Sequence, residues 1–253
     1  MFSESDSYER FMGRWSRLLA PLFVTFARVG EDDRVLDVGS GTGALSCAAA
    51  AVTAAAVTGV DPSAAYVRYA QEQTGGRARF QVGDATALPF ADDAFDRTLS
   101  MLVLNFVGDH AGTVHQMVRV TRPGGVVAAA VWDYGGGMEM LRAFWDAAVA
   151  LDPDAEWRDE RHMPLCTGGA LGELWTAKGL IDVDEQPLTI EMAFSSFDDY
   201  WLPFLRGQGP AGAYVSTLSE SARQALGSRL RERLPAGEFA LRASAWAVRG
   251  VVT

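Results

Sequence analysis

The chain has 253 residues, 49% hydrophobic and 21% charged, and its 32 acidic against 22 basic residues give a net charge of −10. This length suits one α/β domain with insertions, or at most two small domains. The acidic balance argues against a nucleic-acid partner, which usually requires a basic patch on the protein. No run of eighteen uncharged apolar residues occurs, so we expect no membrane span.

The N-terminus and the cysteines bear on the compartment in which the protein works. Residues 1–6 are polar and acidic, unlike a secretory signal with its basic start and apolar core. Cys47 and Cys166 show neither metal-ligand spacing nor a disulfide framework. We therefore expect a cytoplasmic protein without a bound metal.

A glycine-rich turn organises the predicted fold. The apolar, β-branched run 34–38 is typical of a buried parallel strand, and the alanine-rich run 44–51 is typical of a helix. Gly39, Gly41 and Gly43 lie between them. Glycines let the backbone turn sharply and leave no side chain above the strand end, which is where open α/β sheets bind cofactors.

Two kinds of cofactor suit this turn. The spacing Gly39-x-Gly41-x-x-Ala44 satisfies the dinucleotide fingerprint, and Asp61 follows at the distance expected of a ribose-binding acid. Asp37 adds a carboxylate that disfavours a pyrophosphate but tolerates the ammonium group of a sulfonium cofactor with an amino-acid tail. The residues alone leave open an NAD-dependent oxidoreductase as well as an enzyme that uses such a sulfonium cofactor.

Several motifs in order carry a resemblance to one family. The stretch 35–43, VLDVGSGTG, resembles the first motif of class I S-adenosylmethionine-dependent methyltransferases. Asp61, Gly83-Asp84-Ala85, the LPF…FD signature at 88–96 and the RPGG turn at 122–125 resemble later motifs of that family. The resemblance covers residues 33–133 and is greatest for the UbiE-like small-molecule branch, with its methyltransferase type 11 domain.

The resemblance implies an α/β fold with a Rossmann-like, seven-stranded methyltransferase sheet, whose last strand is antiparallel and whose faces both carry helices. We expect a single methyltransferase domain over residues 1–253. Its parts would be an N-terminal arm and helix (1–32), a cofactor-binding core (33–133), two helical substrate-lid insertions (134–179 and 195–236) and two C-terminal strand regions (180–194 and 237–253).

The family pattern also assigns residues to S-adenosylmethionine, with S-adenosylhomocysteine as product. Asp61 would accept hydrogen bonds from the ribose hydroxyls, although Asp-Pro-Ser is also typical of a helix cap. Asp84 would contact the adenine amino group. The arm would fold over the cofactor, or else form an amphipathic helix on the sheet. The expected cofactor residues are Tyr8, Met12, Arg14, Asp37, Gly39, Ser40, Gly41, Asp61, Pro62, Gly83, Asp84, Ala85, Ser100 and Met101.

The expected reaction is methyl transfer by in-line displacement to an O, N or C nucleophile of a small-molecule metabolite. Alignment of the reactants can account for ~7–11 kcal/mol of such a barrier. A general base is needed only if the acceptor loses a proton. His110 is the first candidate, and His162, Asp133 and Tyr134 are alternatives. The expected substrate residues are Asn105, Phe106, Trp132, Tyr134 and Trp201.

Two alternatives to this enzyme remain open at the level of the sequence. One is the NAD-dependent oxidoreductase, and the other is a non-catalytic protein that binds S-adenosylmethionine through its lids. The aromatic residues of 197–205 suit a small core as well as a substrate pocket. As to assembly, we expect a monomer or a homodimer.

Overall fold

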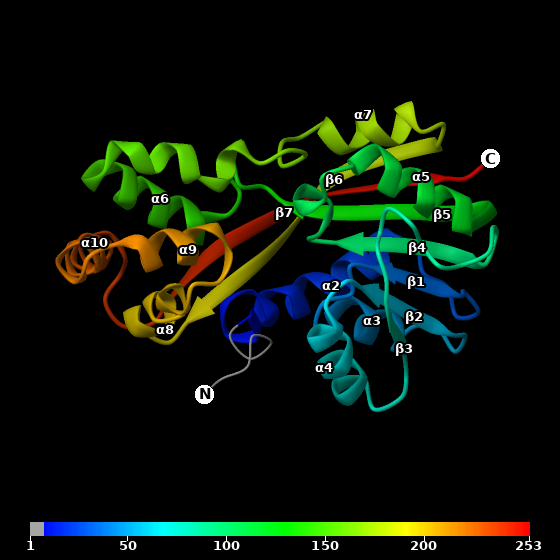
Figure 1. Cartoon of the computed structure of the whole chain (residues 1–253), viewed down its shortest axis with the longest axis horizontal. Helices are drawn as coiled ribbons and strands as arrows, with labels where there is room; N and C mark the ends of the chain where they lie inside the picture. Colours follow the sequence, from blue (N-terminus) through cyan, green and yellow to red (C-terminus); the bar gives the residue numbers. More distant parts are fainter. Residues whose placement is uncertain (1–7) are drawn as a thin grey trace.

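A seven-stranded sheet runs through the computed structural model, which describes residues 8–253 (Figure 1). The strand order is β3-β2-β1-β4-β5-β7-β6. The strands are β1 (Val35–Val38), β2 (Val57–Asp61), β3 (Arg79–Val82), β4 (Phe95–Met101), β5 (Thr121–Trp132), β6 (Ile181–Phe194) and β7 (Phe239–Val251). Strands β1 to β5 are parallel, and β7 is antiparallel to both of its neighbours. This confirms the predicted Rossmann-like sheet with an antiparallel last strand.

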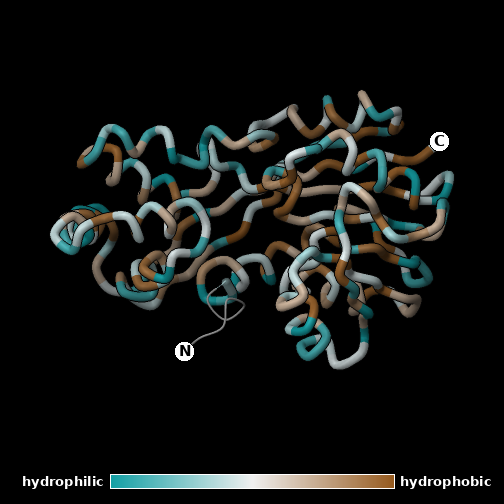
Figure 2. The backbone as a smooth tube through the Cα atoms, in the orientation of Figure 1, coloured by the Kyte–Doolittle hydropathy of each residue, from teal (hydrophilic) through white to brown (hydrophobic). Residues whose placement is uncertain are grey.

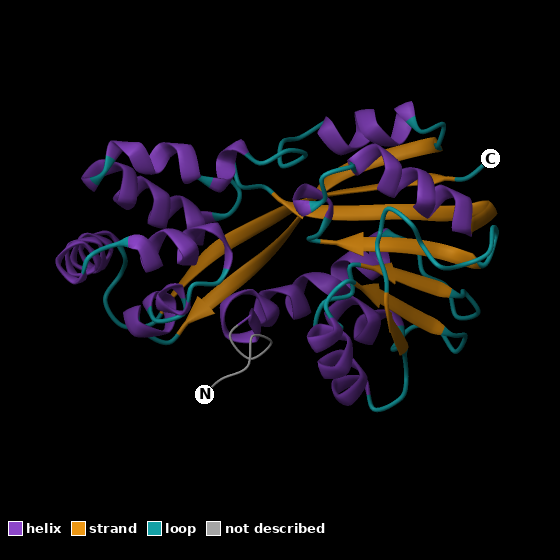
Figure 3. Ribbon diagram, viewed as in Figure 1, coloured by secondary structure: helices purple, strands orange, loops and turns teal. Residues whose placement is uncertain are grey.

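Helices surround this sheet (Figure 3). They are α2 (Arg14–Phe26), α3 (Ala44–Ala49), α4 (Ala64–Thr74), α5 (His110–Val120), α6 (Glu139–Leu151), α7 (Ala170–Ala177), α8 (Phe197–Trp201), α9 (Gly209–Thr217) and α10 (Glu220–Arg233). Helix α2 packs on α3 and β6, α5 packs on β4 and β5, and α7 packs on β6 and β7. None of the helices that residues 8–253 form is long and apolar enough to cross a membrane.

Burial explains the apolar runs in the central strands β1 and β5. All four residues of β1 are buried, as are residues 125–132 of β5. Parallel strands with helices on both faces lose contact with water on both sides, so they form continuous apolar runs. Figure 2 shows the apolar segments concentrated in these central strands.

Strands β6 and β7 reach well beyond the rest of the sheet. They pair antiparallel from Ile181 opposite Val251 to Phe194 opposite Phe239, and their far ends extend to α8 (Figure 1). The sequence indicated only 188–194 as a regular strand within the first of these regions. The first half of β6 was not recognised because it is an exposed edge segment in which charged residues replace the apolar alternation.

The helices of the two insertions, 134–179 and 195–236, have an aromatic core of their own. Phe204 stacks on Phe144 of α6 with 4.6 Å between ring centroids, and its ring meets Phe11 at 5.1 Å and Tyr200 at 5.3 Å. Such ring pairs add about 0.5–1.5 kcal/mol each to the stabilisation from burial. The cluster joins both insertions to the N-terminal segment, so the insertions pack against each other and against that segment.

The RPGG segment forms a bulge instead of preceding the fifth strand. Phe95 pairs with Thr121 and Arg97 with Val126, so residues 122–125 have no partners in the ladder. Asp96 lies at this bulge, and its carboxylate accepts hydrogen bonds from Arg34 (N at 2.8 Å, Nε at 2.9 Å) and from Arg122 Nε. The hydrogen bond from the Arg34 side chain is the main reason that the pKa of Asp96 lies well below its ordinary value.

We expect Asp96→Asn to lower the free energy of unfolding at pH 7 by about 1–3 kcal/mol, the range for hydrogen bonds to a charged group. A carboxyl with a lowered pKa contributes stability above its unfolded pKa of 3.8 and loses it as the pH falls further. The difference between the proteins in urea unfolding should therefore shrink below pH 3.8. The control is Asp92→Asn, since Asp92 pairs with Arg119 on an exposed surface and should change stability little. Equal losses in both variants would contradict this role of Asp96.

Candidate active site

The three glycines after β1 adopt the backbone conformation that makes glycine necessary. Their φ angles are 76° at Gly39, 51° at Gly41 and 90° at Gly43, in the left-handed region. At Gly39 a side chain is also excluded by contact, because a Cβ would lie 2.5 Å from Cγ2 of Val103. At Gly41, no heavy atom of residues 8–253 would lie within 4 Å of a Cβ. The turn therefore leaves open space above the end of β1.

The carboxylate of Asp61 links this turn to the end of β2. Its Oδ2 accepts a hydrogen bond from the Gly41 N–H at 2.9 Å, and its Oδ1 accepts one from the Ser63 N–H at 2.8 Å. Ser63 caps α4, since its Oγ accepts from the Tyr66 N–H. Asp61 is thus part of the glycine turn rather than the helix cap. Burial raises its pKa, and the two hydrogen bonds oppose that rise.

Asp37 is a second carboxyl beneath the turn, and its side chain is almost fully buried. Ser46 Oγ donates a hydrogen bond to Asp37 Oδ2 at 2.6 Å. Burial raises the pKa of Asp37 to about 7, and the nearby charge of Asp61 adds to the effect. Asp37 can therefore take up or release a proton near neutral pH.

These groups line a cavity of about 470 Å³ outside the carboxyl ends of β1, β2 and β4. Such a crevice is the expected ligand site of an open α/β sheet. Most of the predicted cofactor residues lie on its wall, namely Tyr8, Asp37, Gly39, Ser40, Gly41, Asp61, Pro62 and Met101. The structure thus brings together residues from four separate segments of the chain.

Other predicted cofactor residues lie apart from this cavity. Ser100 is buried behind it and donates to the Val38 carbonyl at 2.9 Å. The turn Gly83-Asp84-Ala85 follows β3 and is not among the residues of 8–253 that line the cavity. The exposed Asp84 carboxylate accepts from Thr86 N and Oγ1, both at 2.8 Å, which lowers its pKa.

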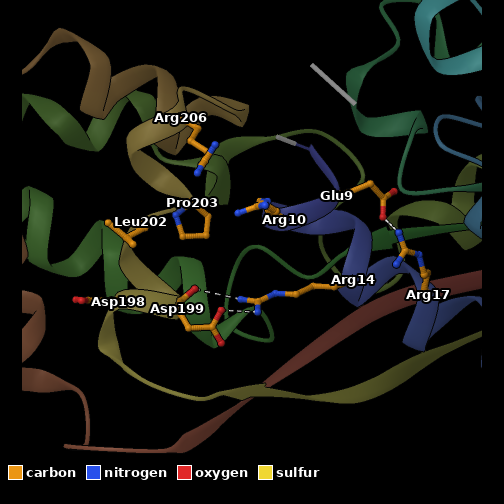
Figure 4. A pocket seen from close by; sticks show the side chains of 9 residues that line it. All are labelled: Glu9, Arg10, Arg14, Arg17, Asp198, Asp199, Leu202, Pro203 and Arg206. Atoms are coloured by element: carbon orange, nitrogen blue, oxygen red, sulfur yellow. Dashed lines mark hydrogen bonds and ion pairs between the residues drawn. The ribbon is translucent and has the colours of Figure 1, made fainter. Parts of the chain in front are cut away.

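Arg14 belongs to a different pocket (Figure 4). Its Nη1 donates to Asp199 Oδ1 at 2.7 Å, and its guanidinium lies 4.1 Å from the ring centroid of Trp15. This pocket, about 450 Å³ in volume, is lined by four arginines and three acids, among them Arg10, Arg17 and Glu9. Arg14 therefore ties α2 to α8 and does not face the cavity above the glycine turn.

A second cavity, of about 90 Å³, adjoins the first. Tyr8, Leu102 and Phe106 line both cavities and form the wall between them. Leu102 has φ 65°, a conformation that costs a residue with a side chain about 1–3 kcal/mol. Its N–H is held by the Ala130 carbonyl at 2.7 Å. The backbone strain at Leu102 thus coincides with the junction of the cavities.

The second cavity gathers several of the predicted substrate residues. Phe106, Trp132, Tyr134 and the predicted cofactor residue Met12 all line it. Asn105 is buried, and its amide donates to the Met163 sulfur at 3.6 Å.

Two further predicted residues lie elsewhere. Trp201 packs on Phe197 in α8 and lines a separate surface pocket beside α10. His110 is the first residue of α5 and lies outside both cavities as residues 8–253 define them.

Glu160 is the residue of the second cavity that sequence reasoning missed. It lies in the short helical turn η4 (Glu160–His162), and only 3% of its surface is exposed. Burial raises the pKa of its carboxyl to about 7. The segment around it lacks any apolar period, so an acid there looked like an ordinary surface residue. No signal other than its place in a lid insertion could have marked it.

Comparisons with known proteins agree with this geometry. A family model described as a methyltransferase domain matches residues 36–129. An uncharacterised protein of Mycobacterium tuberculosis is 35% identical over 214 residues, 81% of this chain and 77% of that protein. The 2-methyl-6-phytyl-1,4-hydroquinone methyltransferase of Synechocystis is 30% identical over 179 residues, 69% of this chain and 55% of that protein.

The solved structures give the same fold. Haemonchus contortus phosphoethanolamine N-methyltransferase 2, in complex with S-adenosyl-L-methionine, has a TM-score of 0.61 at 21% identity, covering 98% of this chain and 56% of that chain. The sheet, its strand order and the cavity at the strand ends define the class I, Rossmann-like methyltransferase fold. The chain belongs to the methyltransferase-domain family and is an S-adenosylmethionine-dependent methyltransferase. The oxidoreductase alternative is thereby set aside.

The contrast between two glycines of the turn can be tested. Gly39→Ala and Gly41→Ala both place a side chain at positive φ, but only the first also drives a Cβ against Val103. We expect Gly39→Ala to lose about 1–3 kcal/mol more stability than Gly41→Ala, the usual cost of overpacking. Urea unfolding of the two variants measures this difference. Equal losses would show that Val103 moves aside without cost.

Proposed function

We propose that this enzyme methylates a small, largely apolar metabolite. Its reactive atom would meet the cofactor at the junction of the two cavities, which Tyr8, Leu102 and Phe106 line. The shared wall is the observation that carries the proposal, because it is where the two cavities meet. The larger cavity would hold S-adenosylmethionine, and the smaller one the reacting end of the acceptor. At about 90 Å³, the smaller cavity is tighter than the ~150 Å³ apolar cavity that admits benzene, so it would admit only that end.

The residues of the larger cavity fit the chemistry of S-adenosylmethionine. An ionised carboxylate offers about four acceptor sites. Asp61 uses two of them on backbone N–H groups, which leaves two for the ribose hydroxyls. The buried carboxyl of Asp37 would favour a positively charged ligand, and the bare backbone at Gly41 would allow close approach.

The cofactor supplies an activated methyl group, so the chain has to align the acceptor and keep water away. Tyr8, which precedes the helical turn η1 (Glu9–Gly13), would cover both cavities from the N-terminal side. Leu102 and Phe106 would fix the approach of the acceptor from the β4 side.

The apolar character of the smaller cavity supports a small-molecule acceptor. Phe11, Leu141 and Pro210 complete walls that are otherwise mostly aromatic or aliphatic. The Synechocystis relative is named for a hydroquinone, which supports an aromatic acceptor here. A net charge of −10 argues against nucleic acid.

Calorimetric titration with S-adenosylmethionine, S-adenosylhomocysteine and NAD tests the cofactor site directly. We expect both sulfur ligands to bind and NAD to remain silent. Asp61→Ala should weaken the binding of S-adenosylmethionine by about 1.5–3 kcal/mol, the scale for hydrogen bonds to a charged acceptor. Asp92→Ala is the comparison, because Asp92 pairs with Arg119 on the surface and is not among the residues that line the larger cavity, so the affinity of that variant should not change. Silence of both sulfur ligands would overturn the proposed site.

The raised pKa of Asp37 leads to a prediction on pH. The free protein should keep a proton on Asp37 up to about pH 7, whereas a cationic ligand favours the carboxylate. Binding of S-adenosylmethionine at pH 6.5 should therefore release protons, and affinity should rise as the pH increases through 7. Calorimetry in buffers of different ionisation enthalpy measures the release. Asp37→Asn should abolish it, and an unchanged release in that variant would exclude Asp37 as the source.

A further inference from the structure

Among the described residues that line the smaller cavity, Glu160 is the one that can carry a charge at neutral pH. The other polar groups there are the phenols of Tyr8 and Tyr134 and the amide of Gln208. A buried carboxyl among apolar walls is costly unless partners stabilise it. Its presence at the acceptor end of the paired cavities therefore requires an explanation.

The carboxyl of Glu160 is held in place from two lid helices. Trp145 Nε1 of α6 donates to Oε2, and the Ala211 N–H of α9 donates to Oε1 at 3.3 Å. These contacts fix both oxygens but leave acceptor sites free on a carboxylate. The group is thus oriented before a ligand arrives, as an effective catalytic group must be.

The charges around Glu160 do not neutralise it. Its neighbour Asp159 is paired with Arg142 and Arg161, so those two guanidinium groups are already engaged. Tyr134, after β5, also faces Glu160, and burial together with the Glu160 charge raises the pKa of the Tyr134 phenol. The phenol is therefore neutral when the carboxylate forms. A carboxylate offers about four acceptor sites, so sites remain on Glu160 for a hydrogen-bond donor of the acceptor.

We propose that Glu160 receives the proton of a phenolic hydroxyl on the acceptor, so that the enzyme is an O-methyltransferase of small phenols. This rests on the proposed function of the two cavities. A carboxylate repels acids and phosphates. It would attract an ammonium group, as Asp37 would attract the cofactor, but that ion would first have to leave water, at a cost that can exceed the attraction. A neutral hydroxyl enters an apolar cavity at the lowest cost and donates to the carboxylate.

The hydroxyl oxygen of the acceptor bonds to the methyl carbon as the carbon–sulfur bond breaks, and that electron pair leaves with sulfur. The hydroxyl proton passes to an oxygen of Glu160. The carboxylate form of Glu160 is therefore the active form, and activity should rise as the pH increases through about 7.

The probe for this proposal is 4-nitrophenol, because only its anion absorbs visible light. We would titrate it at pH 8 into the protein saturated with S-adenosylhomocysteine. Wild type should bind the probe as the neutral phenol, hydrogen-bonded to Glu160, so the visible absorbance should fall. Glu160→Gln should bind it as the anion, since an amide can donate to a phenolate. Retention of the visible absorbance by wild type, absence of binding, or tighter binding of benzylamine would overturn the proposal.

Turnover of the same probe gives a second readout. At saturating S-adenosylmethionine, which removes the effect of Asp37 on affinity, Glu160→Gln should lower kcat at least about 100-fold, as loss of a general base does, and the rise of kcat near pH 7 should disappear. The matched control is Glu156→Gln, because Glu156 belongs to the same insertion but pairs with His162 on the surface. Calorimetry distinguishes failure of the proposed function from failure of the role of Glu160. If S-adenosylmethionine does not bind wild type, the proposed function fails. If it binds and Glu160→Gln behaves as wild type, only the role of Glu160 fails.

Discussion

The hydrogen bond from the Gly41 N–H to the carboxylate of Asp61 is the contact on which the cofactor site depends. It ties the turn after β1 to the end of β2, the neighbouring strand of the sheet. Because the turn backbone is in the left-handed region, it needs both glycine and an external partner for its N–H groups. The Asp61 carboxylate is the external partner of the Gly41 N–H, and it still has free acceptor sites beside the cavity.

The smaller cavity depends on a different construction. The long antiparallel pair β6 and β7 extends the sheet beyond the core, and α8 lies at its far end (Figure 1). The aromatic cluster around Phe204 then joins the two insertions to the N-terminal segment. A site assembled from three distant parts of the chain can be reshaped by changes in the lids without altering the glycine turn. This separation explains how one cofactor site can serve many acceptors.

Two buried carboxyl groups with a raised pKa lie in the two adjoining cavities. Asp37 lies under the larger cavity and Glu160 beside the smaller one. In both cases burial is the main cause, and a hydrogen-bond donor holds the carboxyl in place. Acids with a shifted pKa are common in active sites. The charge of these two cavities therefore depends on pH near neutrality.

The sequence by itself determined the sheet core, the glycine turn and the acid at the end of β2, because these are set by local requirements. Only glycine suits the φ of Gly39, and only strands covered on both faces need runs such as that of β1. The fold alone decided that Arg14 meets Asp199, that Leu102 separates two cavities and that Glu160 lines one of them. These contacts join residues up to 185 positions apart, and no local pattern encodes which distant side chain will lie opposite. Packing of the lids on the sheet makes that choice.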